Sequence, residues 1–498
     1  MEKSKNNRNV ILIYPPSYFQ TFFATKSGMS DIPLSLLYLS GAIRHLCEEI
    51  LILDYNTPPP PGINTDKSKY LYALLDEKEP VIVGINCLFS GNFPDVLRIS
   101  KEVKERSPAT KVVIGGMHPT LWAKEIMEHC EVIDAIMLGE GDNSFPLLVE
   151  QYFKNPDNPD IEALESVVIR WNSRIITKER KRYITNLDSL PMPGYEYFDM
   201  RQYAAREDTT KWFNPNKVPI SAVQFPLLTS RSCPNQCNFC AMRLVMGDIY
   251  RYRSPEHVFN EIQYLYEKYG ITYFKIMDDN FTINKKRTIE ICNLIIKNNL
   301  KIAFDTPNGL MAGTLDDEVI DNLCRAGMIR FSIAIESASD FIRNDILHKN
   351  ISKEKIHNII YILRKHNVFV STLFMIGFPE ETEETLKEML SFIKSLDVDA
   401  ITLAKLMPFP GTALYEQCKK DNLFTNSVDE DNLWQGKQEF VYAGPKDFSI
   451  KPYNLTMNKL ADYDEEIRSL ITKKNERWAN HVRVMSYQST VIANKKEK

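Results

Sequence analysis

Residues 230–240 read Ser-Arg-Ser-Cys-Pro-Asn-Gln-Cys-Asn-Phe-Cys. The three cysteines, Cys233, Cys237 and Cys240, have the spacing C-x₃-C-x₂-C, so their thiolates can converge on a centre of zinc or of iron and sulfur. Structural zinc usually takes four ligands from two paired clusters, and the next cysteine along the chain is Cys292. An iron–sulfur cubane held by three thiolates instead leaves one iron open to a small molecule. The spacing therefore favours a catalytic iron–sulfur centre over structural zinc.

The cysteine loop follows the first of several short apolar runs in residues 223–411. The predicted strands are 225–230, 273–277, 302–305, 330–335, 369–376 and 400–405. Helices between them have good start signals, such as Ser254 with Pro255 and Thr382 with the two glutamates that follow it. The pattern predicts a partial (βα)6 barrel, an open relative of the eightfold barrel, with its chemistry at the carboxyl ends of the strands.

Residues 1–152 show the same alternation of short apolar runs and amphipathic stretches. The runs 10–14, 50–53, 81–86, 111–115 and 135–138 predict an N-terminal α/β domain with a doubly wound, Rossmann-like parallel sheet. Loops with proline or glycine follow most of these runs, and together they favour a ligand site at the carboxyl edge over plain turns. Residues 153–222 are rich in proline and are predicted to be a linker with a small sheet of its own. Residues 412–498 form a mixed C-terminal segment, partly helical.

The composition is that of an ordinary globular protein. The chain has 498 residues, 44% of them hydrophobic and 25% charged, which excludes disorder and fibrous folds and suggests about three domains. The net charge of −4 gives no basic field for nucleic acid. No apolar run approaches the roughly 20 residues of a membrane span, and the polar start lacks a signal peptide's apolar core. We therefore expect a cytoplasmic protein with reduced thiols, in which an odd number of cysteines, nine, argues against a disulfide framework.

The cysteine loop resembles the signature of the radical S-adenosylmethionine (SAM) superfamily, including the aromatic Phe239 before the last cysteine. The resemblance implies a 4Fe–4S cluster on Cys233, Cys237 and Cys240, with Phe239 on the cluster or adenine side. In that family the open iron chelates the amino and carboxylate groups of SAM. Electron transfer then cleaves SAM to methionine and a 5′-deoxyadenosyl radical.

The same resemblance implies further contacts to SAM after later strands. The residues are Asp278, Asp279, Glu336, Ser337 and Gly377. The position of the two aspartates often carries Gly-Gly-Glu in the family and binds the SAM amino group, so which carboxylate acts here stays open. Helix capping is the alternative role for the aspartates. The segment of Glu336 and Ser337 resembles one that contacts the ribose or carboxylate, with an ion pair as the alternative for Glu336. Gly377 begins a turn like the family's adenine-side turn.

A doubly wound domain before a radical SAM barrel resembles the cobalamin-binding subfamily, and the resemblance extends over about four-fifths of the chain. The residues that it places at cobalamin are Pro15, Cys87, Gly115, Gly116, His118, Gly139, Glu140 and Gly141. The D-x-H-x-x-G motif that supplies a histidine to cobalt in many cobalamin proteins is absent. We therefore expect cobalt without a histidine below it. His118 would line the corrin or the nucleotide tail, or alternatively be a strand-end histidine bonded to backbone.

The family resemblance implies a cobalamin-dependent radical SAM methyltransferase. It would transfer a methyl group from SAM, via methylcobalamin, to an unactivated carbon of a metabolite, natural-product intermediate or peptide, or more rarely to phosphinate phosphorus. Alternatives are a radical rearrangement or cyclisation with the same cofactors, loss of cobalamin from the first domain, and a non-catalytic iron–sulfur, metal-binding or electron-transfer module. A flavodoxin or ferredoxin would supply electrons. We expect a monomer without nucleic-acid or membrane partners, and the substrate is not encoded in a readable motif.

Overall fold

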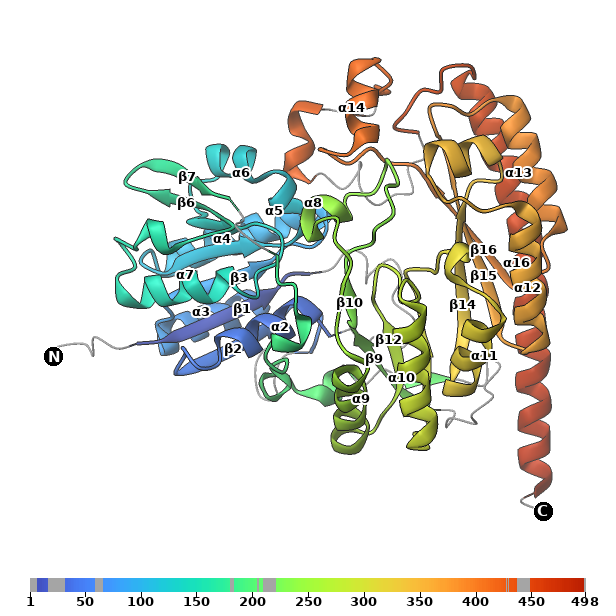
Figure 1. The fold of residues 1–498 in the computed structure, drawn as a ribbon. Coiled ribbons are helices and arrows are strands. Elements are labelled where there is room, and N and C mark those ends of the chain that lie inside the picture. Colours follow the sequence, from blue (N-terminus) through green and yellow to red (C-terminus); the bar gives the residue numbers. More distant parts are fainter. Residues whose placement is uncertain are drawn as a thin grey trace. The chain divides into compact units, whose positions relative to one another are not determined.

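A computed structural model describes residues 7–16, 32–58, 66–179, 183–203, 206–208, 221–426, 428, 430–436 and 448–496. The chain divides into two compact units. The N-terminal unit comprises Met1–Ala205 with two later segments, Met242–Gly247 and Val428–Pro445. The barrel unit comprises Arg206–Ala241, Asp248–Ser427 and Lys446–Lys498. Figure 1 colours both units along the sequence.

The N-terminal unit is built on a seven-stranded sheet. Its strands, in spatial order, are β2 (Glu49–Asp54), β1 (Asn9–Tyr14), β3 (Ile82–Asn86), β4 (Lys111–Gly115), β5 (Ala135–Met137), β6 (Val167–Trp171) and β7 (Arg174–Lys178). The first five are parallel in the order 2-1-3-4-5, which places the topological switch point between β1 and β3. The predicted doubly wound sheet is confirmed. The hairpin β6–β7 pairs antiparallel with β5, so the prediction that it forms a separate sheet was wrong.

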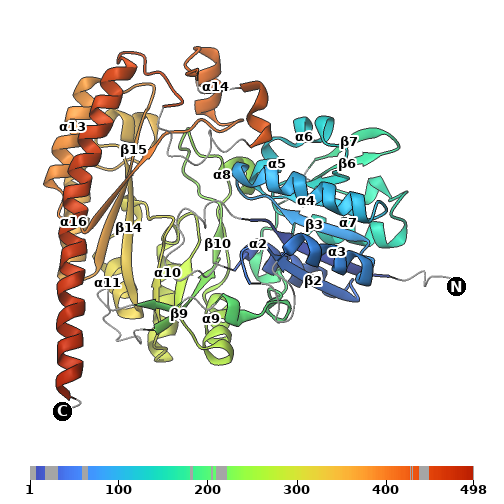
Figure 2. The same ribbon diagram turned by 180° about the vertical axis from the view of Figure 1, so that it is seen from behind.

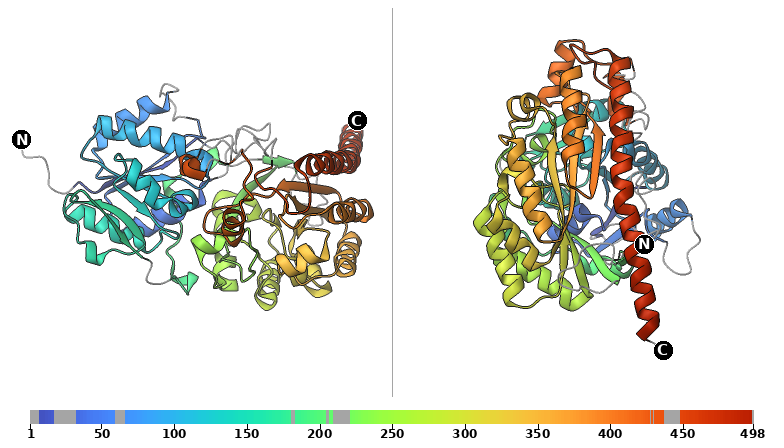
Figure 3. Two further views of the ribbon diagram at one scale, coloured as in Figure 1. Left: turned by 90° about the horizontal axis from the view of Figure 1, so that it is seen from above. Right: turned by 90° about the vertical axis from the view of Figure 1, so that its right-hand side faces the viewer.

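Helices cover both faces of this sheet (Figures 2 and 3). The described helices of this unit are α2 (Leu34–Ile43), α3 (Lys67–Lys78), α4 (Phe93–Arg106), α5 (Met117–Leu121), α6 (Ala123–His129) and α7 (Ser144–Lys154), and the short α8 (Met242–Met246), from a later segment, packs beside α5. Helix α4 shows why they form. Its first turn contains a proline and Asp95, and Phe93, Val96, Ile99 and Val103 are buried along one face.

The barrel unit contains a second seven-stranded sheet. Its strands, in spatial order, are β16 (Ala400–Lys405), β15 (Phe369–Ile376), β14 (Met328–Glu336), β13 (Ala303–Asp305), β12 (Ile271–Ile276), β9 (Ser221–Leu227) and β8 (Arg206–Asp208). All neighbours are parallel except β8, which runs antiparallel to β9. A two-stranded ribbon, β10 (Ser230–Arg231) with β11 (Arg251–Tyr252), follows β9. The prediction of a partial barrel with parallel strands is confirmed.

Two of the barrel helices begin at the predicted capping residues Ser254 and Thr382. The barrel helices are α9 (Pro255–Tyr269), α10 (Lys285–Lys297), α11 (Asp317–Ala326), α12 (Lys353–Lys365), α13 (Glu383–Ser395) and α14 (Ala413–Lys420). The side chain of Ser254 accepts from the N–H of His257 at the start of α9, and Thr382 forms a capping box at the start of α13. Helix α11 ends at Gly327, whose φ of 114° is in the left-handed region.

The long helix α16 (Met457–Lys496) packs against β16 and α13. Strand β16 is the edge of the sheet, and the side chain of Asn475 forms two hydrogen bonds with it. The Asn475 oxygen accepts from the N–H of Ile401 at 3.0 Å, and its amide nitrogen donates to the C=O of the same residue at 3.1 Å. Arg468 also donates to the C=O of Leu403 at 3.3 Å. Side chains of α16 thus bond the free backbone groups of the edge strand.

Within the described residues, no helix combines the length and apolar character that crossing a membrane would require.

Candidate active site

The cysteine loop begins directly after β10 in the barrel unit. Cys233, Cys237 and Cys240 are half-buried and are not joined in disulfides. The Asn235 side-chain amide donates to the Cys237 sulfur at 2.9 Å and to the C=O of Leu347 at 3.4 Å, and the Cys237 thiol lies 3.6 Å from that same carbonyl. The loop is therefore fixed against the segment that follows β14.

The donor chemistry of this loop fits an iron–sulfur cluster. Among the described residues, no three histidine, cysteine or carboxylate side chains surround one point closely enough to hold a single metal ion. A cubane makes no such demand, because each thiolate binds a different iron. Three thiolate donors on one loop, without a closed tetrahedral set, thus suit the cluster better than structural zinc.

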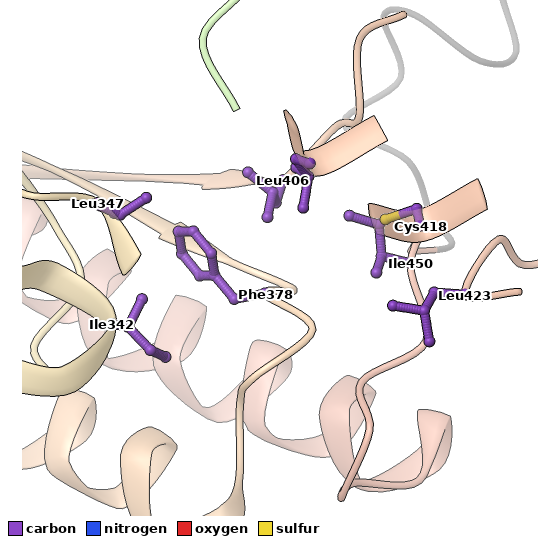
Figure 4. Close-up of a cluster of buried hydrophobic side chains, with 8 residues drawn as sticks. Ile342, Leu347, Phe378, Leu406, Cys418, Leu423 and Ile450 are labelled. Atoms are coloured by element: carbon purple, nitrogen blue, oxygen red, sulfur yellow. The ribbon is translucent and has the colours of Figure 1, made fainter. Parts of the chain in front are cut away.

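The side chain of Phe239 packs against a hydrophobic core. It packs against a buried cluster that includes Leu347, Phe378, Leu406 and Leu414 (Figure 4 shows this cluster). The backbone C=O of Asn238 also accepts from the N–H of Leu414 at 3.0 Å. The aromatic residue of the signature therefore anchors the loop on the barrel unit.

Asp278 and Asp279 follow β12 but have different surroundings. Asp278 is buried and accepts from the Thr229 N–H at 2.6 Å, the Thr229 hydroxyl at 2.5 Å and the Ser230 hydroxyl at 2.6 Å. It ties the end of β9 to the start of the cysteine loop. Asn284, not either aspartate, caps helix α10, so the capping alternative was wrong.

Asp279 is half-buried beside the cysteine loop. Burial, followed by the charge of Asp278, raises the pKa of Asp279 to about 6, although a hydrogen bond with the backbone of Ser232 opposes the shift. Its charge also raises the pKa of the Cys233 thiol, after the larger effect of burial. The carboxylate of Asp279 thus lies close to the thiols. The three hydrogen bonds from Thr229 and Ser230 go to Asp278 and not to Asp279.

Glu336 ends β14 and forms an ion pair with Lys349 at 3.0 Å. Their side chains are 12% and 7% exposed, so the pair is buried rather than a surface pair. Glu336 has a φ of 67°, and the β14–β15 register shifts between Ala334 and Glu336. A non-glycine residue in this left-handed region has a strained backbone, and the contacts around it must offset that cost.

Lys349 also acts on the thiols. Burial raises the pKa of Cys237, and the ammonium of Lys349 is the largest influence that lowers it. Burial by itself would lower the pKa of Lys349, but Glu336 and the nearby Cys237 outweigh it and raise this pKa. A buried cation therefore stands next to the cysteine loop.

The loop between Ser337 and Lys349 is organised by a residue that the sequence analysis missed. Arg343 is fully buried and donates to the carbonyls of Ser337 at 3.1 Å, Ala338 at 3.0 Å and Ile351 at 3.0 Å. It also pairs with Asp340. Ser337 itself is buried, and its hydroxyl accepts from the N–H of Ser339 at 3.2 Å.

In the N-terminal unit, the predicted cobalamin residues lie at or directly after the carboxyl ends of the parallel strands, with Gly115 at the end of β4 and His118 in α5. The N–H of Cys87 donates to the C=O of Gly115 at 2.7 Å. At Gly116, with a φ of 122°, an added Cβ would lie 2.5 Å from the Cys87 carbonyl oxygen, so only glycine fits. The N–H of Gly139 donates to the Thr120 hydroxyl oxygen at 3.0 Å.

Three more of these predicted residues have local contacts. The C=O of Pro15 accepts from the Asn56 side chain at 2.9 Å, and the C=O of Glu140 from the Ser144 hydroxyl at 3.3 Å. A Cβ on Gly141 would meet the Leu39 side chain at 3.0 Å. The glycines leave the backbone at this edge of the sheet uncovered by side chains, so that a large cofactor could approach it closely.

His118 is buried and bonded at both ring nitrogens. Nε2 lies 2.9 Å from the C=O of Trp434, which only accepts, so Nε2 carries the proton and Nδ1 accepts from the Ser90 hydroxyl at 2.9 Å. Burial lowers the pKa of His118 to about 4, although the Trp434 bond opposes the shift. These contacts match the alternative of a strand-end histidine bonded to backbone.

Comparisons with known proteins agree with this arrangement of two units. Residues 227–393 match the radical SAM superfamily, and residues 21–149 match the B12 binding domain. The chain belongs to the cobalamin-binding radical SAM family. Because both family models match in the predicted order, the predicted family, enzyme class and cofactors (a 4Fe–4S cluster, SAM and cobalamin) are confirmed. The assignments of single residues to these cofactors stay predictions.

Relatives of this radical SAM protein include methyltransferases. An uncharacterized methyltransferase of Pyrococcus horikoshii is 29% identical over 83% of this chain and 84% of its own length. The cytidylyl-2-hydroxyethylphosphonate methyltransferase of Streptomyces wedmorensis is 25% identical over 90% of this chain and 91% of its own. Among solved structures, the radical SAM methyltransferase TsrM of Kitasatospora setae has a TM-score of 0.68 at 15% identity, covering 92% of this chain and 82% of its own. That structure supports the fold.

Glu381 lies in the turn after β15, and its burial shifts its pKa towards neutral pH. One carboxyl oxygen accepts from the N–H of Gly377 at 2.8 Å, and the other has no hydrogen-bond partner within the described part of the chain. Burial raises the pKa of Glu381 from 4.5 to about 8, although hydrogen bonds from the backbone of Gly377 and Phe378 oppose it. Between about pH 4.5 and pH 8, the Glu381 carboxyl therefore stays protonated in the folded protein and is ionised in the unfolded chain.

This pKa sets a pH dependence of stability. Because the folded pKa is above the unfolded value, the stabilising contribution is complete below about pH 4.5 and is lost at about 1.4 kcal/mol per pH unit up to about pH 8. Glu381→Gln keeps the acceptor for Gly377 and carries no charge. We expect its melting temperature to exceed that of wild type by a margin that widens from about pH 5 to about pH 8. A margin that is constant with pH would contradict the raised pKa.

Proposed function

We propose that this radical SAM enzyme transfers a methyl group from SAM, through cobalamin, to an unactivated carbon of a small molecule. The observation that carries the proposal is that the three-thiol loop and a doubly wound cobalamin-type unit occur in one chain. When bound, the cluster and SAM supply a radical that activates the substrate carbon, and cobalamin supplies the methyl group. The protein's own residues bind and position these cofactors.

Each residue of the barrel site has a distinct task in this proposal. The thiolates of Cys233, Cys237 and Cys240 hold the cluster, and Asn235 orients the middle one. Asp279 accepts hydrogen bonds from the SAM amino group, because its neighbour Asp278 already accepts three bonds from the protein. The bulge at the end of β14, the Ser337 loop and the turn that begins at Gly377 bring backbone to the remainder of SAM.

The division of labour between the two aspartates can be measured. We expect Asp279→Asn to keep the fold and full iron content but to weaken SAM binding by about 10- to 100-fold, because a charge-assisted hydrogen bond is lost. Asp278→Asn places an amide N–H₂ among three donors, so it should lower the melting temperature and the iron content. Isothermal titration with SAM and thermal unfolding of both variants separate these effects. The assignment is wrong if Asp278→Asn is the variant that weakens SAM binding without loss of stability.

A second function is favoured by other relatives. The anaerobic magnesium-protoporphyrin IX monomethyl ester cyclase of Cereibacter sphaeroides is 25% identical over 69% of this chain and 54% of its own length. A cyclisation or rearrangement with the same cofactors would use the same residues without net methyl transfer. The cyclase covers less of this chain, and this chain less of the cyclase, than is the case for the two methyltransferases, which leaves methyl transfer as the better supported function.

Product analysis distinguishes the two functions. Anaerobically reconstituted protein, with hydroxocobalamin, a reductant and candidate substrates, should yield both 5′-deoxyadenosine and S-adenosylhomocysteine. Deoxyadenosine alone would support the cyclase-like alternative, and neither product would support a binding module. Flavodoxin or ferredoxin can replace the chemical reductant in the same assay. Size-exclusion chromatography tests the proposed monomer.

A further inference from the structure

Residues 430–436, here called the strap, lie within Val428–Pro445, a stretch of the N-terminal unit that is preceded and followed in the sequence by the barrel unit. The strap contains a short helical turn, η9 (Glu430–Gln435), and packs beside α6. The sequence analysis assigned it only to a mixed C-terminal segment. The strap is more than 200 residues further along the chain than Met1–Ala205, the main part of the unit that it joins.

The strap is held by specific contacts to the loops after β3 and β4. The C=O of Trp434 accepts from His118 at 2.9 Å, and the same imidazole accepts from Ser90, so His118 bridges the strap and the β3 loop. The Trp434 ring stacks on His129 of α6 at a centroid distance of 4.9 Å. It also meets the Phe93 ring edge-on at 6.2 Å.

Gly436 closes the strap against the same loop. Its φ is 64°, and a Cβ at this position would lie 2.0 Å from the backbone oxygen of Ser90. Real side chains cannot approach that closely, so this contact requires glycine. Ser90 is thus contacted by the strap directly and through His118.

We propose that the strap is a structural part of the cobalamin site, because it holds the β3 and β4 loops in the conformation that receives the cofactor. These loops lie at the carboxyl edge of the parallel sheet, where doubly wound units bind ligands. Loops fixed before binding need not be ordered by the cofactor, which strengthens binding without any new contact to it. His118 is on this view a positioning residue, and the inference rests on cobalamin being a cofactor of the proposed function.

Gly436→Ala tests the inference without altering any residue predicted to touch cobalamin. The added methyl group collides with the Ser90 backbone, so the strap should detach and chymotrypsin should cleave faster after Trp434. Gly270→Ala is a matched control, because Gly270 has a φ of 67° and nothing within 4 Å of an added Cβ. We expect the dissociation constant of hydroxocobalamin, measured by absorbance titration, to rise at least about tenfold in Gly436→Ala and to stay unchanged in Gly270→Ala.

A second variant approaches the strap through a different contact. Trp434→Ala removes the ring that meets His129 and Phe93, and we expect it also to weaken hydroxocobalamin binding while SAM binding and iron content stay at wild-type values. Unchanged hydroxocobalamin affinity in both variants, with faster proteolysis of the strap, would overturn the inference and leave the proposed function intact. A wild-type protein that binds no hydroxocobalamin would overturn both.

Discussion

Cys237→Ala is expected to abolish cleavage of SAM. The variant removes the middle thiolate of the loop, the one that is fixed by Asn235 and lies beside the Leu347 carbonyl. We expect the iron content after anaerobic reconstitution to fall from about four atoms per chain to below about one. The rate of 5′-deoxyadenosine formation under reductant should fall at least about 1,000-fold, since SAM cleavage requires the cluster's electron. Iron analysis and product quantification by liquid chromatography measure the two effects.

Cys418→Ala is the matched control. Cys418 is buried in the hydrophobic core against which Phe239 packs, so its loss creates a small cavity without removing a cluster ligand. Such a cavity costs about 1 kcal/mol of stability, and iron content and SAM cleavage should stay at wild-type values. Full iron and normal SAM cleavage in Cys237→Ala would contradict the assignment of the three thiols. Equal losses in Cys418→Ala would show that the first result reports unfolding.

Lys349→Met is expected to have the second largest effect. The substitution leaves the carboxylate of Glu336 buried without its partner, which costs about 3–5 kcal/mol for a buried ion pair. It also removes the cation that most strongly favours the thiolate of Cys237. The loss of positive charge beside the cluster disfavours the reduced state, so the midpoint potential should become more negative by on the order of tens of millivolts. Calorimetry measures the stability, and a redox titration followed by electron paramagnetic resonance measures the potential.

The double variant Lys349→Met with Glu336→Gln separates the two roles of this pair. Without a buried charge, the double variant should regain much of the lost stability. Its midpoint potential should remain below that of wild type, because Lys349 influences Cys237 more strongly than Glu336 does. A single variant with unchanged potential and unchanged stability would show that the pair does not act on the cluster.

Strand positions and the cysteine loop could be predicted from the sequence because their signals are local. Short apolar runs bounded by turn residues gave strands such as β15 and β16 with the bounds that the structure has. The capping signals at Ser254 and Thr382 were equally local. The hairpin β6–β7 was placed in a linker because nothing within it shows that its partner is β5, a pairing across a whole helix.

The division of roles within the site could not be predicted, since it depends on contacts between distant residues. The adjacent Asp278 and Asp279 are chemically identical in the sequence, and only the hydrogen bonds from Thr229 and Ser230 separate them. Lys349 is 13 positions from Glu336 in a loop without a motif. His118 had no readable partner because Trp434 is 316 residues away.

The amide of Asn475 reaches back 74 residues to Ile401, and this has a consequence during translation. All the barrel strands leave the ribosome before the helix that seals the last of them. Until that helix is made, the nascent sheet presents a row of unpaired peptide groups to other chains. Expression vectors that end the protein within residues 457–475 should therefore produce self-associating material, whereas an affinity tag placed after residue 498 leaves the seal intact.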